Sequence, residues 1–220
     1  MRDAGLEEAI RDAGGAGALA RKMGTAPAGA MDEIDTARAQ EYALLSTLLA
    51  RAPDESLLSR LAELRGDATP LGLAHVALAE AAGRTNVERV EREYFDLFIG
   101  IGRGELLPYG SYYMSGFLYE RPLARLRAAL SKLGIERSAA QAEPEDHAAV
   151  LCEIMAGLAD GRFPAPPDAE RELFEHQVAP WMGRFFADLE QAQAADFYRA
   201  TGTLGRVFIQ IETEAFALPT

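Results

Sequence analysis

The chain has 220 residues and a net charge of −12 at pH 7, with 49% hydrophobic and 25% charged residues. This size and composition are typical of one globular domain with a substantial core. The negative charge excludes a nucleic-acid-binding protein, which needs a basic face to neutralise phosphates, and it favours basic partners.

Signals for export or membrane insertion are weak. No stretch approaches the roughly 20 apolar residues that a membrane-spanning helix needs, and no apolar segment follows Arg21 and Lys22, as a secretory signal would require. The single cysteine, Cys152, lies in an apolar helical run, so we expect a buried side chain, with a catalytic thiol as the alternative. These features predict a cytoplasmic protein with no direct membrane insertion.

The first half of the chain divides into a tail and a series of helices. Residues 1–34 are rich in alanine and glycine and are expected to form a flexible tail. From Asp35 a helical apolar pattern begins, and Asp54 is expected to cap a second helix. Pro70 should open a third helix and Asn86 should cap a fourth. Residues 35–220 are therefore predicted to form one domain.

The second half begins with a break at residues 100–110, which hold too many glycines for a helix interior. Helices are expected at 121–133, 145–159, 168–189 and 193–216, with inward-facing side chains in the last at Phe197, Leu204, Phe208 and Ile211. No segment alternates as a strand does, so the sequence predicts an all-α, single-domain helical bundle. The connector 134–144 is a candidate hinge, so the protein is expected to be a monomer or a domain-swapped homodimer.

Two short segments carry the strongest functional signals. In residues 143–147, Pro144 suits a first helical turn, and Glu145 and Asp146 suit the positive end of the helix dipole. Local physics alone therefore explains this run as a helix start. His147 could bond Asp146 or Glu143, and these groups would then shape a polar rim for a partner's peptide.

The second segment runs from Pro108 into an aromatic cluster that follows the glycine-rich break. The cluster consists of Tyr109, Tyr112, Tyr113, Phe117 and Tyr119. These rings either fill the core or form a groove for an apolar helix or extended peptide, with tyrosine hydroxyls at its wet edge.

Four segments of the chain resemble the motifs of one protein family and follow one another in the same order as in that family. The acidic-Pro-x-Asp-His run at 143–147 and the Pro-aromatic-Gly-Ser run within 108–113 match its motifs. Residues 94–100 resemble its Tyr-x-x-Leu-Phe-x-Gly stretch, and residues 38–45 resemble its opening helix. Over residues 36–214 the chain is similar to the TorD/DmsD/NarJ-like redox-enzyme maturation chaperones, which proofread proteins for twin-arginine (Tat) export.

The resemblance implies a TorD-like fold and a cytoplasmic chaperone rather than an enzyme, with no cofactor of its own. Such a chaperone binds the twin-arginine signal peptide, the apo form of a molybdopterin-dependent oxidoreductase, or both, and assists cofactor insertion before export. The implied client-binding residues are Tyr109, Ser111, Tyr112, Glu143, Asp146 and His147, with Pro108, Gly110 and Pro144 as a structural motif. The acidic neighbour of His147 is expected to raise its pKa toward neutrality.

Charge supports a cationic client. Residues 141–200 contain twelve acidic and four basic side chains. The carboxylates could pair with arginines of a leader, or they could form an ordinary solvated surface.

The rival function is a soluble all-helical enzyme with a bundle-core metal site, which needs glutamate three residues before histidine. None of His75, His147 and His176 has that neighbour, so no metal ligand is assigned. The glycines at 100–104 lack the context of a phosphate-binding loop.

Overall fold

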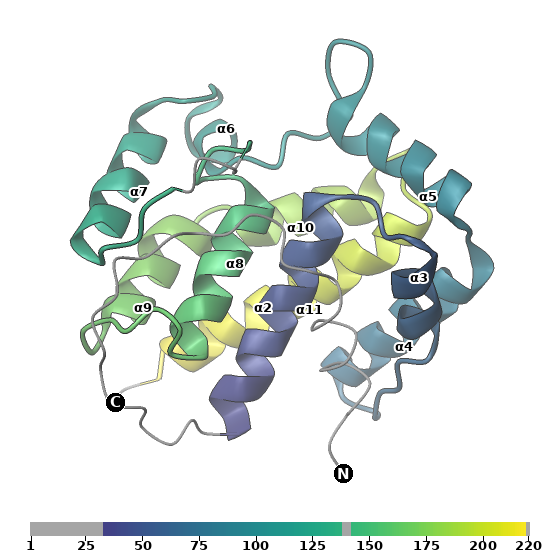
Figure 1. The fold of residues 1–220 in the computed structure, drawn as a ribbon, viewed down its shortest axis with the longest axis horizontal. Coiled ribbons are helices and arrows are strands. Elements are labelled where there is room, and N and C mark those ends of the chain that lie inside the picture. The colour runs from purple at the N-terminus through teal and green to yellow at the C-terminus, as the bar shows by residue number, and fades with distance from the viewer. Residues whose placement is uncertain (1–32, 138–141, 219–220) are drawn as a thin grey trace.

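The computed structural model describes residues 33–137 and 142–218, which form an all-helical structure (Figure 1). The predicted tail lies outside these residues, apart from its last two positions, and so does the middle of the predicted hinge. Within the described ranges no β-strand occurs, and the all-α prediction is confirmed. The elements are α2 (Glu33–Ala50), α3 (Glu55–Ala62), α4 (Pro70–Arg84), α5 (Val87–Tyr94), the π-helical turn η1 (Phe95–Ile99), α6 (Gly110–Ser115), α7 (Arg121–Lys132), α8 (Ala148–Ala159), α9 (Ala169–Leu173), the π-helical turn η2 (Phe174–Val178), α10 (Met182–Gln191) and α11 (Phe197–Phe216).

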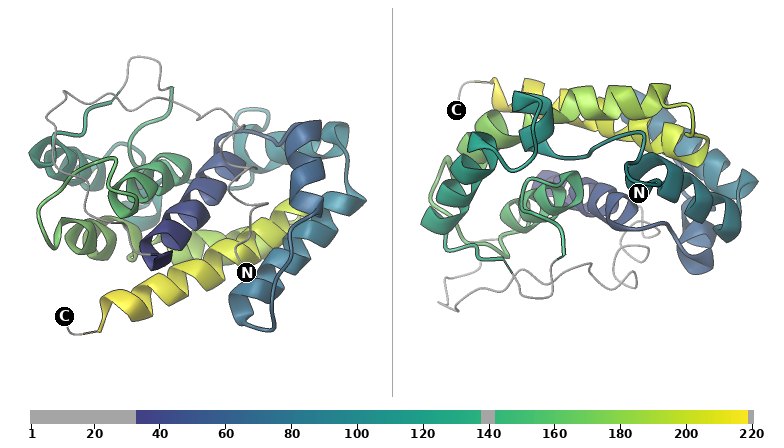
Figure 2. Two further views of the ribbon diagram at one scale, coloured as in Figure 1. Left: turned by 60° about the horizontal axis from the view of Figure 1, so that its bottom comes forward. Right: turned by 90° about the horizontal axis from the view of Figure 1, so that it is seen from above.

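The helix α8 lies at the centre of the molecule and packs along α2 (Figures 1 and 2). All of its residues except Glu153 are buried, which includes Cys152, whose pKa burial raises. The helices α10 and α11 lie side by side, and α11 also packs against α4. In Figure 1, α7 and α9 lie at one end of the molecule and α3 to α5 at the other. Within the described ranges, no helix combines the length and apolar character that crossing a bilayer requires.

Helix starts follow the predicted caps. Asp54 Oδ1 accepts a hydrogen bond from Leu57 N–H at 2.9 Å, and Asn86 Oδ1 accepts one from Arg89 N–H at 3.0 Å. Pro70 occupies the first turn of α4. Each cap satisfies a backbone donor that has no partner within its helix.

Four predictions about the later helices are wrong. The helix expected at 193–216 begins at Phe197. The helix expected from Glu145 begins at Ala148, because residues before it bond to another segment. The single helix expected at 168–189 is interrupted before α10, since Pro180 cannot donate in a helix interior. In α11, Phe197, Leu204 and Phe208 are buried as predicted, but Ile211 is 40% exposed.

An ionic network joins α2 and α11. The Arg38 guanidinium donates to both carboxylate oxygens of Glu212 at 2.8 Å and to Glu170 at 2.5 Å. Tyr42 Oη donates to Glu212 at 2.9 Å. Because Glu212 is almost fully buried, these contacts compensate its charge and fix α2 and α9 to α11.

Candidate functional site

The two motif segments, about 35 residues apart in the chain, are joined by their backbones. Tyr109 and His147 form an isolated antiparallel bridge. Gly110 N–H donates to the Asp146 carbonyl and Ala148 N–H donates to the Pro108 carbonyl, both at 2.8 Å. The start of α6 and the start of α8 are therefore held as one unit, which we call the motif junction: residues 108–111 and 143–148.

The Asp146 side chain lies inside the junction and is 3% exposed. Its Oδ2 accepts a hydrogen bond from Ser111 N–H at 2.8 Å, so it satisfies a donor at the start of α6. Its Oδ1 is buried and has no hydrogen-bond partner among the described residues. Asp146 therefore holds the backbone of the junction.

His147 is the N-cap of α8 and is 5% exposed. Its Nδ1 accepts a hydrogen bond from Ala149 N–H at 3.1 Å, a role that requires an unprotonated Nδ1. Its ring lies edge-on to the Tyr109 ring, with 5.1 Å between centroids.

The expected rise in the pKa of His147 is wrong. Burial lowers this pKa from 6.5 to about 4 and outweighs the opposing effects of Glu143 and Asp146. The imidazole is neutral at physiological pH, and its Nδ1 bonds the α8 backbone rather than Asp146 or Glu143.

The small residues of the junction allow close packing. Gly110 lies against the buried Trp181 ring, and a Cβ at this position would approach Trp181 Nε1 to 3.0 Å. Ser111 is fully buried, and its Oγ accepts a hydrogen bond from Tyr119 N–H at 3.2 Å. Pro144 is buried as well, and its carbonyl accepts from His147 N–H at 3.1 Å.

The accessible part of the site is an aromatic and acidic rim. Tyr109 Oη donates to the exposed carboxylate of Glu143 at 2.8 Å, and burial together with this bond raises the pKa of Tyr109. The Arg103 guanidinium lies 5.6 Å from the centroid of the half-buried Tyr112 ring and donates to its hydroxyl at 3.4 Å. Phe117 is 68% exposed nearby in the chain. We call Tyr109, Tyr112, Phe117 and Glu143 the rim.

The aromatic cluster therefore divides between core and surface. The Tyr113 ring packs on Trp181 and Phe185, and its hydroxyl donates to Asp188 at 2.8 Å. Phe117 and Tyr119 are exposed. The core interpretation holds for Tyr113, and the groove interpretation stays a prediction for the exposed rings.

Sequence reasoning missed two partners of the junction. Glu145 is buried and accepts from Arg127 Nε at 3.0 Å; although burial alone would raise its pKa, this cation lowers it. Trp181 covers Gly110. Because Trp181 is the only tryptophan of the chain, composition could have marked it as a candidate partner of the junction. No sequence pattern links Arg127 to Glu145.

The acidic region 141–200 is less available than its composition indicates. Five of its carboxylates are in ion pairs within the molecule: Glu145 with Arg127, Asp160 with Arg162, Glu170 with Arg38, Glu175 with Arg171 and Glu190 with Arg206. Carboxylates such as Glu143 and Glu172 are exposed. Recognition of a cationic peptide would depend on this smaller set.

The remaining histidines have structural partners. His75 Nε2 lies 2.6 Å from Glu41 Oε1 inside the bundle, and His176 Nδ1 lies 2.8 Å from the Glu172 carbonyl. Across the part of the chain that the structure describes, no group of three or more His, Cys, Asp or Glu side chains is placed to hold a metal ion.

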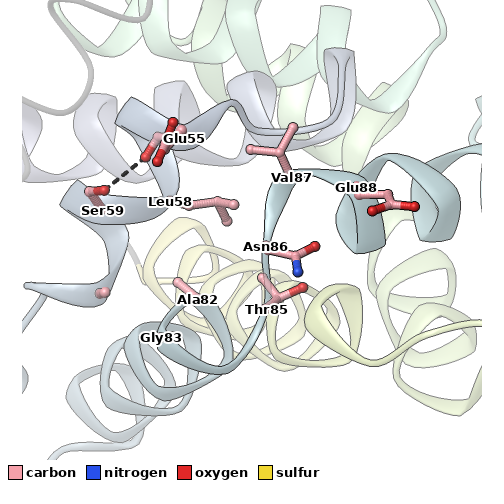
Figure 3. A pocket seen from close by; sticks show the side chains of 10 residues that line it. Glu55, Leu58, Ser59, Ala82, Gly83, Thr85, Asn86, Val87 and Glu88 are labelled. Atoms are coloured by element: carbon pink, nitrogen blue, oxygen red, sulfur yellow. Dashed lines mark hydrogen bonds between the residues drawn. The ribbon is translucent and has the colours of Figure 1, made fainter.

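A hollow of about 510 Å³ lies away from the junction, between α3, the end of α4 and the start of α5 (Figure 3). Leu58, Ala82 and Val87 contribute apolar surface, and Glu55 and Glu88 lie on opposite sides. No residue of the motif junction lines it.

Comparison with known proteins places this geometry in context. The model of the family described as nitrate reductase delta subunit matches residues 64–187. The chaperone protein TorD of Aliivibrio fischeri is 27% identical over 203 residues, which cover 82% of this chain and 94% of that protein. DmsD of Haemophilus influenzae, described as a Tat proofreading chaperone, is 30% identical over 119 residues, covering 53% and 57% of the two chains.

A solved structure from Archaeoglobus fulgidus, assigned as a redox enzyme maturation protein, superposes with a TM-score of 0.52. The match covers 87% of this chain and 99% of that one at 22% identity, so it shows a shared fold.

Proposed function

Because the chain belongs to the nitrate reductase delta subunit family, which includes the TorD- and NarJ-like proteins, we propose that it is a cytoplasmic maturation chaperone. It binds the twin-arginine signal peptide, the apo form of a molybdopterin-dependent oxidoreductase, or both. It holds the client until its cofactor is inserted and then allows export. It requires no catalytic step and no cofactor of its own.

One observation carries this proposal: both resembling segments meet in the motif junction, inside the range that the family model matches. The relatives named TorD and DmsD are chaperones, which supports a binding role rather than an enzymatic one. A rigid scaffold that presents an adaptable rim suits such a role.

The six implied client-binding residues divide into two groups in this proposal. Tyr109, Tyr112 and Glu143 are accessible and contact the client. Ser111, Asp146 and His147 are buried, so they act by positioning the rim rather than by contacting the client.

The rim suits a leader peptide by chemistry. A leader presents arginines followed by an apolar segment. The Glu143 carboxylate can accept charge-assisted hydrogen bonds from a guanidinium, while the Tyr112 and Phe117 rings offer apolar surface for the segment that follows.

Deletion of the gene tests the function in the cell. Activity of the exported molybdoenzyme should fall, and wild-type protein supplied from a plasmid should restore it. Metal analysis of the purified protein provides the opposing test. Stoichiometric iron or manganese, with normal molybdoenzyme activity in the deletion strain, would support the metal-enzyme rival instead.

A further inference from the structure

The helix α7 differs in charge from the rest of this acidic molecule. Its segment carries Arg121, Arg125, Arg127 and Lys132 and no acidic residue. Among the helices of the described ranges it is the only one whose charges sum to a positive value, while the whole chain carries −12. Leu123, Leu126 and Leu130 anchor its inner face in the core.

Three of these cations form a row on the outer face. Arg121, Arg125 and Lys132 are exposed, and in the described parts of the chain no ion pair engages their side chains. Their spacing of four and seven residues places them on one side of the helix, over about 16 Å. Arg127 differs, because it pairs with Glu145 at 2.9 Å and ties α7 to the motif junction.

Two exposed rings lie just before α7 in the chain. Phe117 is 68% and Tyr119 is 66% exposed. Tyr119 has φ +62°, a backbone conformation that non-glycine residues rarely adopt, and its N–H is held by Ser111 Oγ. Large exposed rings that precede, in the chain, a row of cations without ion pairs among the described residues have the composition of a recognition surface.

We propose that Phe117, Tyr119, Arg121, Arg125 and Lys132 form a docking surface for an acidic polypeptide segment that also carries apolar side chains. Carboxylates of the segment pair with the guanidinium groups, and its apolar side chains cover the rings. The cationic twin-arginine leader is repelled by this row. The surface shares Phe117 with the rim, but its row of cations lies outside the rim, so it goes beyond the proposed leader binding. A client's body or another protein would supply the segment.

The geometry favours a narrow polypeptide over other anions. An anionic bilayer is a broad plane and would also meet other parts of this molecule, whose net charge is −12, whereas a single segment meets only the row. A second copy of this chain is less suitable, because Glu145, Glu170 and Glu190 of its acidic region are already paired.

The test measures fluorescence anisotropy of a labelled, glutamate-rich synthetic peptide containing leucines, with a glutamine-for-glutamate peptide as reference. The variant Arg121→Gln/Arg125→Gln/Lys132→Gln removes the row. Its matched control, Arg65→Gln/Arg89→Gln/Arg92→Gln, removes the same charge from three other exposed arginines. Because all six side chains are exposed, both variants should fold, and circular dichroism and melting temperature check this.

Wild type should bind the glutamate peptide and not the glutamine peptide. The row variant should bind about tenfold more weakly and the control within about twofold of wild type, since each exposed pair contributes modestly. Phe117→Ser should also weaken binding. No binding by wild type, or an equal loss in both triple variants, would overturn the proposal.

Two parallel measurements identify the competing occupants. Phosphatidylglycerol vesicles that bind wild type but not the row variant, without peptide binding, would overturn the proposal in favour of a bilayer. A concentration-dependent mass in light scattering that only the row variant loses would overturn it in favour of a second copy. Leader binding is measured separately, so failure of this surface leaves the proposed function standing.

Discussion

At the scale of single residues, the site depends on a histidine that burial keeps neutral. His147 caps α8 through an unprotonated Nδ1, and its pKa of about 4 lies below the 6.5 of an exposed imidazole. Protonation would remove the acceptor and place a charge in a buried position. The role of this side chain is therefore to hold the junction.

This lowered pKa predicts a pH-dependent stability. The unfolded state binds the proton more readily between pH 6.5 and 4, so the contribution of His147 is complete above pH 6.5 and is lost as pH falls toward 4. Between pH 7.5 and 5.0 its share of the loss should be about 2 kcal/mol. Urea unfolding at both pH values should show this, and His147→Asn, which keeps an acceptor without titrating, should lose correspondingly less. Equal losses in both proteins would contradict the assignment.

Removal of the Asp146 carboxylate should destabilise the junction. Asp146→Ala leaves Ser111 N–H without its acceptor, at a cost of about 1–3 kcal/mol in the free energy of unfolding. Glu143→Ala, in the same loop but exposed, should change stability by no more than about 0.5 kcal/mol. Urea denaturation compares the two, and equal costs would show that Asp146 does not hold the backbone.

Substitutions in the rim, unlike Asp146→Ala, should weaken client binding without lowering stability. Tyr112→Ala and Glu143→Gln should weaken binding of a client leader peptide by about tenfold or less, because each removes one surface contact, while melting temperatures stay near wild type. Leu73→Ala on α4, which also removes an exposed apolar group, serves as the control. Calorimetric titration measures the affinities. Unchanged affinity in both rim variants would place the leader elsewhere.

Residue-level prediction succeeded where local chemistry decides. Asp54 and Asn86 cap helices as their types indicate, because a cap needs only its own next turn. It failed for His147, because sequence shows the acidic neighbours but not the burial that outweighs them. The contact between Tyr109 and residues 143–147 joins segments far apart in the chain, so no local pattern could predict it.

At the scale of elements, the Arg38 network links α2, α9 and α11. Arg38→Ala would leave Glu212 buried without a cation and should cost about 3 kcal/mol or more in the free energy of unfolding. A double-mutant cycle with Glu212→Ala tests the coupling. The double variant should cost clearly less than the sum of the single ones, and additive costs would show that the pair does not interact.

Element boundaries were predictable where glycine, proline or a cap acts alone, as at Pro70 and at Gly134, which has φ +67° after α7. The break at Pro180 was missed because apolar periodicity continues across it. The late start of α8 has a tertiary cause, since residues 143–147 bond the segment before α6 rather than extending the helix.

At the scale of the whole molecule, chain-long helical periodicity was sufficient to predict an all-α fold, whereas the arrangement of the helices came only through the family resemblance. The sequence shows how many charged residues each segment carries, but it does not show where their side chains lie on the folded molecule. The paired carboxylates of residues 141–200 and the cationic outer face of α7 both depend on which side of a helix faces the core.

The net charge of −12 predicts how a cationic leader binds. Attraction between the acidic molecule and the arginines should be screened by salt, so the affinity should fall as ionic strength rises. Calorimetric titrations at low and high salt measure this. Salt-independent affinity would leave only the apolar part of the rim as the recognition surface.

The central claim is that the protein binds an immature molybdoenzyme. Native mass spectrometry of the full chain mixed with its oxidoreductase, leader attached, tests this most directly, using one sample without molybdopterin and one fully loaded. The account predicts a complex with the apo form and little or none with the loaded form. No complex with the apo form, or equal binding of both forms, would contradict it.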